Sequence, residues 1–114
     1  MAMMDIYPVK EGHCLLIPKK HYENLLDVDL DLLAKMSRRL AELTRKMKKA
    51  LKPEGVLVAA ANGEGAGQEI PHLHFHVIPR NSGDEFRFHF PEGYHDKMAD
   101  RAQLDRLAAK IAKS

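Results

Sequence analysis

The sequence has one cysteine, no tryptophan and no long apolar run. A single cysteine, Cys14, excludes an internal disulfide, which suits the reducing cytosol, and we expect it to be a small buried apolar residue. No apolar stretch approaches the ~20 residues that span a bilayer, and the N-terminus has no signal-peptide pattern. We therefore expect a cytoplasmic protein without a membrane partner.

The chain also has little net charge. The 114 residues carry a formal net charge of +2 at pH 7, which gives no electrostatic reason to expect nucleic acid as the main partner. The composition, 45% hydrophobic and 30% charged, is that of an ordinary globular protein. We expect one domain over residues 1–114, with a core of modest size.

Hydrophobic periodicity indicates an α+β fold with one long helix. Asp27 and Asp29 lie near the predicted start of this helix, and Pro53 and Gly55 end it. Its apolar residues recur at spacings of three and four and form one stripe: Leu33, Met36, Leu40, Leu43, Met47 and Leu51.

Short apolar runs predict strands around this helix, at 13–17, 56–60 and 70–79. Residues 81–114 form a C-terminal extension. Within it, the alternation of Phe86, Phe88 and Phe90 with polar residues indicates an edge strand or flap, and 97–113 is expected to be helical. Antiparallel strands with a long helix and a C-terminal helix make an α+β architecture.

The most informative stretch places His72, His74 and His76 at alternate positions. In an extended strand these side chains share one face, with neighbours ~6.5–7 Å apart, while the intervening apolar residues face a core. Imidazole near neutral pH serves as a nucleophile, a proton carrier or a metal ligand. Three on one face are difficult to explain by packing alone.

Two chemical interpretations of this row are open at this point. His74, flanked on both sides, could attack phosphorus while its neighbours orient it and donate to a leaving group or phosphate oxygen. Alternatively, two histidines of the row and a third such as His13 could bind zinc. The glycine-rich loop at 63–67 could bring backbone N–H groups close to an anion, and Gln68 adds an amide.

Two blocks of sequence resemble the histidine triad family of nucleotide hydrolases and transferases. The first is Gly67-Gln68-Glu69-Ile70-Pro71-His72-Leu73-His74-Phe75-His76-Val77-Ile78-Pro79-Arg80. The second is Asp5-Ile6-Tyr7-Pro8 followed by Gly12-His13-Cys14-Leu15-Leu16-Ile17-Pro18-Lys19-Lys20-His21. The resemblance covers about residues 4–80, and the segment after Arg80 carries no motif of that family.

The resemblance implies catalytic roles for four histidines. His74 corresponds to the nucleophile, which forms a nucleotidyl-histidine at the α-phosphate. His76 corresponds to the histidine that contacts phosphate and leaving group, and its presence favours hydrolysis over transfer. His72 corresponds to a histidine that orients the site together with His13. His21 also matches a family histidine, although a surface position at the helix entry explains it equally well.

The resemblance also implies a set of substrate contacts. Asp5 corresponds to an acidic residue that binds ribose hydroxyls, while Ile6 and Leu16 correspond to walls of a base pocket. Gln68 corresponds to a contact with phosphate or leaving group. Ala61 stands where many members have Asn or Gln, and the adjacent Asn62 could compensate for its missing amide.

One departure concerns the N-terminal side. The family has an early helix and one or two strands before the position of Asp5, so we expect reduced or missing N-terminal strands here. A sheet edge would then carry unpaired backbone groups unless a partner covers it. Base affinity would depend on how residues 1–7 complete the pocket.

The sequence therefore predicts a histidine triad hydrolase of a nucleoside phosphoramidate or a dinucleoside polyphosphate. No metal ligand set and no required cofactor are expected, although a divalent cation could accompany a polyphosphate substrate. The resemblance implies a homodimer with the long helix near the interface. The alternatives are a nucleotide-binding or regulatory module with weak or no turnover, and a zinc-binding protein.

Overall fold

The computed structural model of the chain describes residues 2–4, 11–84 and 92–114. Its elements follow the order β1 (Ala2–Met4), β2 (Cys14–Leu16), α1 (Leu30–Leu51), β3 (Gly55–Ala59), a 3₁₀ turn η1 (Glu64–Ala66), β4 (Phe75–Arg80) and α2 (Arg101–Ala112). The α+β prediction, with one long helix and a C-terminal helix, is confirmed. The expected strand or flap at Phe86, Phe88 and Phe90 lies outside the described residues.

The four strands form one antiparallel sheet in the order β1-β2-β4-β3. β4 is an inner strand: Leu15 of β2 and Ala59 of β3 both lie opposite its His76. β1 pairs along the other edge of β2, with Met4 opposite Cys14. The strand predicted at 56–60 therefore pairs with the strand that carries His76.

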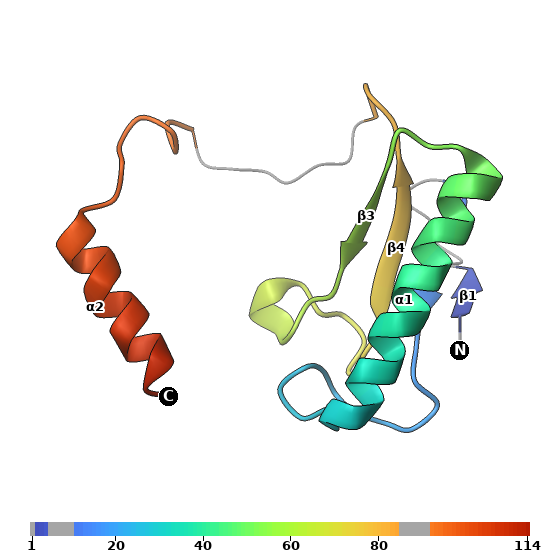
Figure 1. Ribbon diagram of the computed structural model, residues 1–114, viewed down its shortest axis with the longest axis horizontal. Helices are drawn as coiled ribbons and strands as arrows, with labels where there is room; N and C mark the ends of the chain where they lie inside the picture. The colour runs from blue at the N-terminus through green and yellow to red at the C-terminus, as the bar shows by residue number, and fades with distance from the viewer. Residues whose placement is uncertain (1, 5–10, 85–91) are drawn as a thin grey trace.

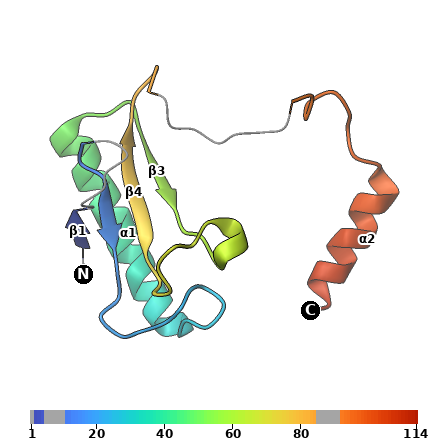
Figure 2. The same ribbon diagram turned by 180° about the vertical axis from the view of Figure 1, so that it is seen from behind.

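Helix α1 covers one face of this sheet and contacts β4 and β3 (Figures 1 and 2). Asp29 caps its N-terminus, with Oδ2 accepting from the Leu32 N–H at 3.0 Å. Its C-terminus is closed by Lys52 in the left-handed conformation, at φ 53°. The predicted stripe is oriented inward at Met36 and Met47, which are buried, whereas Leu51 is exposed.

The core under α1 contains side chains from the helix, from the segment before it and from β4. Val28, Met36 and Leu73 are buried together, with four partly buried side chains packed around them: Tyr22, Leu32, Leu33 and Phe75. Leu73 and Val77 are the largest fully buried side chains. The prediction that apolar residues between the histidines enter the core is confirmed.

The histidine segment differs from its prediction in one respect. The regular strand begins at Phe75, so His72 and His74 precede it. Pro71 has no N–H to give to a ladder, and the His72 N–H turns back to the Ile70 carbonyl at 2.8 Å. The Leu73 N–H donates to the Tyr22 carbonyl at 2.7 Å, so this stretch is held by the 18–22 segment instead of a neighbouring strand.

The C-terminal extension stands apart from the rest of the chain. Figures 1 and 2 show α2 separated from the sheet and α1. Every residue from 92 to 114 is exposed, including the apolar residues Leu104, Leu107 and Ile111 of α2. The helix predicted at 97–113 is confirmed, but within the described residues its apolar side is not part of a core.

Candidate active site

The candidate site lies on the sheet face opposite α1. Because successive side chains of a strand alternate, Phe75 faces α1 and His76 faces the other way. Leu15, directly opposite His76, shares that face, as does His13 two residues earlier. The site is thus built where β4 and β2 lie side by side.

His13 and His76 form the inner part of the site. The Nε2 atom of His13 lies 2.9 Å from the Nδ1 atom of His76, with their ring centroids 5.1 Å apart. Only 2% of His13 is exposed, so this ring is held inside the fold. A hydrogen bond between two imidazoles requires one to donate and the other to accept, and the pair therefore shares a defined proton position.

His74 stands edge-on to His76, with ring centroids 4.9 Å apart and an interplanar angle of 74°. Its Nδ1 atom lies 2.8 Å from the backbone carbonyl oxygen of His72. A carbonyl oxygen only accepts hydrogen bonds, so Nδ1 carries the proton. In the neutral ring Nε2 then holds a lone pair, which is the state required of a histidine nucleophile.

His72 is held by two contacts of its own ring. Its Nε2–H donates to the Pro18 carbonyl at 2.9 Å, and its Nδ1 lies 3.2 Å from the Nδ1 of His21. Since Nδ1 of neutral His72 then accepts, His21 donates. The resemblance pairs His72 with His13, but the structure places His21 against His72 and His13 against His76. His21 thereby joins the site, a role that the sequence left open.

Gln68 lies beside the histidines in sequence but uses its amide inside the fold. Its Oε1 accepts from Asn24 Nδ2 at 3.1 Å and from the Gly63 N–H at 2.8 Å. Its Nε2 donates to the carbonyls of Glu23, at 2.6 Å, and Ile70, at 2.9 Å. These four bonds use its hydrogen-bonding capacity, so this conformation leaves none for the phosphate contact that the resemblance implies.

The glycine-rich loop likewise uses its backbone N–H groups for hydrogen bonds within the loop. The N–H groups of Ala66, Gly67 and Gln68 donate to carbonyls within the loop, and that of Gly63 donates to Gln68. Gly63 and Gly67 adopt φ values of 95° and 96°, which glycine reaches without strain. In this conformation the N–H groups of Gly63, Ala66 and Gly67 are used within the loop, and the approach of this loop to an anion stays a prediction.

Asn62 and Asn24 join this loop to the segment before α1. Asn62 Oδ1 accepts from the Leu25 N–H at 2.9 Å, so it fastens the two segments together. Asn24, 5% exposed, was not identified from the sequence. Its Oδ1 accepts from the Leu26 N–H at 2.9 Å, which is an Asx turn, and an Asn just before the predicted helix was the available signal for such a local turn.

Register locates the remaining predicted contacts. Leu16 is opposite Phe75, so its buried side chain faces α1 and not the histidines. A one-residue shift moves a side chain to the other face, and Leu15 is the residue on the histidine side. The predicted base-pocket wall at Leu16 is therefore not supported by this register. Asp5 and Ile6 lie outside the described residues.

Cys14 and Arg80 have structural partners. The Cys14 thiol lies 3.2 Å from the Gly12 carbonyl, and burial raises the pKa of this thiol, which keeps it protonated at neutral pH. The Arg80 guanidinium is ion-paired with Asp84 through Nε, at 2.8 Å from Oδ2. Among residues 2–4, 11–84 and 92–114, no group of three His, Cys, Asp or Glu side chains could share a metal ion.

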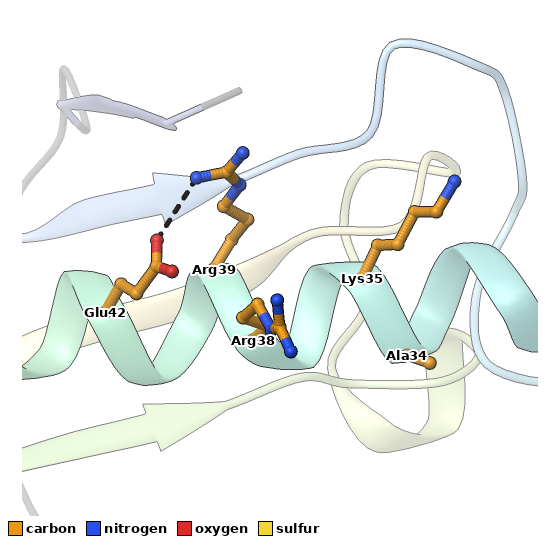
Figure 3. A pocket seen from close by; sticks show the side chains of 5 residues that line it. All are labelled: Ala34, Lys35, Arg38, Arg39 and Glu42. Carbon is orange, nitrogen blue, oxygen red and sulfur yellow. Dashed lines mark hydrogen bonds and ion pairs between the residues drawn. The ribbon is translucent and has the colours of Figure 1, made fainter.

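A surface depression of about 480 Å³ lies elsewhere, along one side of α1 (Figure 3). Among the residues that the structure describes, its lining comes from that helix: Ala34, Lys35, Arg38, Arg39 and Glu42. Arg39 and Glu42 pair at 3.2 Å within it. None of the site histidines contributes to this depression, so it does not belong to the candidate site. No described helix is long and apolar enough to cross a membrane.

Replacing Gln68 with Ala is expected to lower the free energy of unfolding by about 1–3 kcal/mol, because it leaves Asn24, Gly63 and two carbonyls without their partner. Urea denaturation measures this change. Glu69→Ala, at the exposed neighbouring position, is the control and should change stability by less than about 0.5 kcal/mol. Equal effects of both variants would contradict the structural role of Gln68.

Asp27 is expected to make stability depend on pH. Hydrogen bonds from the N–H groups of Asn24 and Glu23 hold the pKa of Asp27 below its ordinary value of 3.8. A lowered folded-state pKa stabilises the fold above the unfolded value, and this contribution is lost as the pH falls. In urea titrations from about pH 5 to about pH 3, Asp27→Asn should therefore lose less stability than the wild type. A pH dependence of stability that is the same for Asp27→Asn and the wild type would refute the assignment.

Comparison with known proteins agrees with this geometry. A family model for the HIT domain matches residues 1–83. The crystal structure of a Streptococcus mutans protein is 35% identical, with a TM-score of 0.89, covering 98% of this chain and 69% of that one. A HIT family protein of Bacillus subtilis is 32% identical, with a TM-score of 0.87, covering 98% and 79%.

Curated relatives show the same similarity. An uncharacterized HIT-like protein of Borreliella burgdorferi is 43% identical over 77% of this chain and 65% of its own length. An adenylylsulfatase of Arabidopsis thaliana is 33% identical, over 74% of this chain and 43% of its own length. An adenosine 5′-monophosphoramidase of Saccharomyces cerevisiae is 38% identical, over 69% and 48%. The chain spans only 55–65% of the length of four HIT-like relatives. On the family model, the relatives and the shared fold, the chain belongs to the HIT domain family.

Proposed function

We propose that this protein hydrolyses a nucleotide conjugate at its α-phosphate through a nucleotidyl intermediate on His74. The observation that carries the proposal is the 2.8 Å bond from His74 Nδ1 to the His72 carbonyl, with His76 beside the ring. It selects the tautomer whose Nε2 can attack phosphorus. The adjacent imidazole of His76 supplies a group able to move a proton.

In the first step, Nε2 of His74 attacks the α-phosphorus. A phosphorus–nitrogen bond forms, and the bond from phosphorus to the leaving group breaks, with the electron pair going to the leaving group. With His76 protonated on both ring nitrogens, its Nδ1–H donates to Nε2 of His13, and its own Nε2 carries the second proton. His76 then donates that proton to the departing amine or phosphate as a general acid.

In the second step, water attacks the nucleotidyl-histidine. His76, now lacking its Nε2 proton, accepts a proton from the water, the phosphorus–nitrogen bond breaks, and the nucleoside monophosphate leaves. The ring of His74 regains its lone pair. His72 and His21 contribute by position: the bonds to Pro18 and His21 fix the His72 segment, whose carbonyl orients His74.

The substrate class follows from the chemistry of the site and the names of the relatives. Adenylylsulfatase and adenosine 5′-monophosphoramidase both denote cleavage next to an adenosine 5′-phosphoryl group. We propose a nucleoside phosphoramidate as the substrate, with a dinucleoside polyphosphate as the second candidate. No metal is required for the two steps, although a divalent cation could accompany a polyphosphate. Asp5, Ile6 and Asn62 remain predicted substrate contacts.

We also propose a homodimer in the cytoplasm, with a nucleotide as the small-molecule partner and neither nucleic acid nor membrane as a partner. The small net charge and the single cysteine support these proposals. The family resemblance supports the homodimer. Each is tested separately from hydrolysis.

Substitution of the nucleophile gives the direct test. His74→Ala is expected to reduce release of AMP from adenosine 5′-monophosphoramidate by about 10³-fold or more, because it removes the nitrogen that attacks phosphorus. His76→Ala should reduce it by about 10²–10⁴-fold through loss of general acid catalysis. His95→Ala, which removes an exposed histidine of the C-terminal extension, is the control and should retain full activity.

Mass spectrometry of His76→Ala protein, quenched without acid after mixing with substrate, should detect a species heavier by one nucleotidyl group, which is one nucleoside monophosphate less water. The species should be missing when His74 is also replaced with Ala. Substrate that binds but is never turned over by the wild type would favour the nucleotide-binding module. Turnover unchanged in His74→Ala would overturn the mechanism.

A further inference from the structure

Helix α1 concentrates positive charge in a chain that has little net charge. Residues 30–52, which are α1 and its C-cap, hold eight basic and two acidic residues, a net charge of +6. The other residues hold ten basic and fourteen acidic ones, a net charge of −4. The small overall charge therefore hides a strong division between this helix and the rest of the molecule.

The basic residues of α1 gather on the side that faces away from the sheet. Arg45 follows the buried Met36 by nine residues, which is about two and a half turns and the opposite side of a helix. Arg38 precedes the buried Met47 by the same number, and Lys49 lies about one turn beyond Arg45. We call five exposed residues of this side the basic ridge: Lys35, Arg38, Arg45, Lys46 and Lys49.

The helix dipole accounts for only part of the basic ridge. Cations near a helix C-terminus are favourable, which explains Lys49. This effect fades within the terminal turns, so it gives no reason for Lys35 and Arg38 in the first half of α1. Like charges four residues apart, such as those of Arg45 and Lys49, also destabilise a helix. A ligand of opposite charge would relieve this repulsion.

The acidic residues of α1 leave the basic ridge unneutralised. Glu42 pairs with Arg39, at 3.2 Å, which is not a member of the ridge. Asp31 forms no ion pair with any residue that the structure describes. The remaining ion pairs among the described residues lie after β4 and in α2, so none of them involves the ridge.

The depression of about 480 Å³ on α1 adjoins the ridge (Figure 3). Lys35 and Arg38 of the ridge line it, and the small side chain of Ala34 leaves space beside them. The aliphatic parts of Lys and Arg can cover apolar atoms while their charged groups reach an anion. This surface therefore fits a carboxylate that is followed by a small apolar group.

The observations favour an acidic protein segment over other occupants. A second copy docked on the ridge by two-fold symmetry would place ridge against ridge, and like charges repel. An acidic membrane requires an apolar helix side toward the lipid, but the apolar side of α1 is buried over the sheet. Single-stranded nucleic acid is bound with aromatic side chains, of which residues 30–52 have none, and the charge of −4 elsewhere repels a longer polyanion.

We propose that the basic ridge binds an acidic segment of a partner protein, whose carboxylates pair with Arg38 and Arg45. A guanidinium group matches a carboxylate with two parallel hydrogen bonds. Because α1 and the site histidines lie on opposite faces of the sheet, the segment and a nucleotide can be bound at the same time. This binding goes beyond the proposed hydrolysis and does not depend on it.

Amide chemical shifts of the full chain test the proposal. The probe is a peptide of about ten glutamates, blocked at both ends, which spans the ~21 Å from Lys35 to Lys49 when it is extended. Added to ¹⁵N-labelled protein at low salt, it should shift the amide signals of α1 between these residues, and the shifts should shrink as salt is raised. Shifts confined to other segments, no shifts, or tighter binding of an oligouridylate of equal length would overturn the proposal.

Matched double variants separate the ridge from a general attraction to positive charge. Arg38→Gln combined with Arg45→Gln should raise the dissociation constant of the peptide by about tenfold or more, because both guanidinium groups are lost. Arg101→Gln combined with Arg106→Gln makes the same charge change at exposed positions of α2 and should change it by less than about twofold. Equal weakening by the two pairs would contradict a site on α1. Glutamine is a good helix former, and circular dichroism checks that both variants keep their helices.

Discussion

Burial of Leu73 and Val77 beneath α1 is the constraint on which the site depends. Both side chains are essentially inaccessible, and Leu73 is further tied to Tyr22 through its backbone N–H. Because alternate residues point to opposite sides, this burial directs His72, His74 and His76 away from the helix. Removing a fully buried leucine from such a core costs about 2–5 kcal/mol, so the row of histidines is as firmly placed as the core itself.

Around that row, polar groups of the backbone do much of the positioning. The carbonyls of Pro18 and His72 accept from ring nitrogens, and each such contact decides which nitrogen of a neutral imidazole keeps its lone pair. Gln68 and Asn24 hold the adjoining loop through buried amide hydrogen bonds. The site is thus supported by a shell of groups that the proposed reaction need not touch.

The elements with strong periodicity were predictable from the sequence. The stripe from Leu33 to Leu51 predicted α1, and the alternation at 72–78 predicted both a core face and a histidine face. Pairwise contacts were not predictable, because His13 and His21 are distant in sequence from their partners. Only the strand register decides which side chains come into contact. The same register turns Leu16 inward and leaves Leu15 beside His76, a distinction of one residue. Gln68 illustrates a further limit, since its four partners come from three separate segments.

The central claim is that His74 is neutral with its proton on Nδ1, held there by the His72 carbonyl. Long-range ¹H–¹⁵N correlation spectra of the ring, recorded at neutral pH and assigned with His74→Ala, read this tautomer directly. The account predicts a protonated Nδ1 and an unprotonated Nε2 for His74. A ring protonated on Nε2, alone or together with Nδ1, would leave no lone pair for attack on phosphorus and would contradict it.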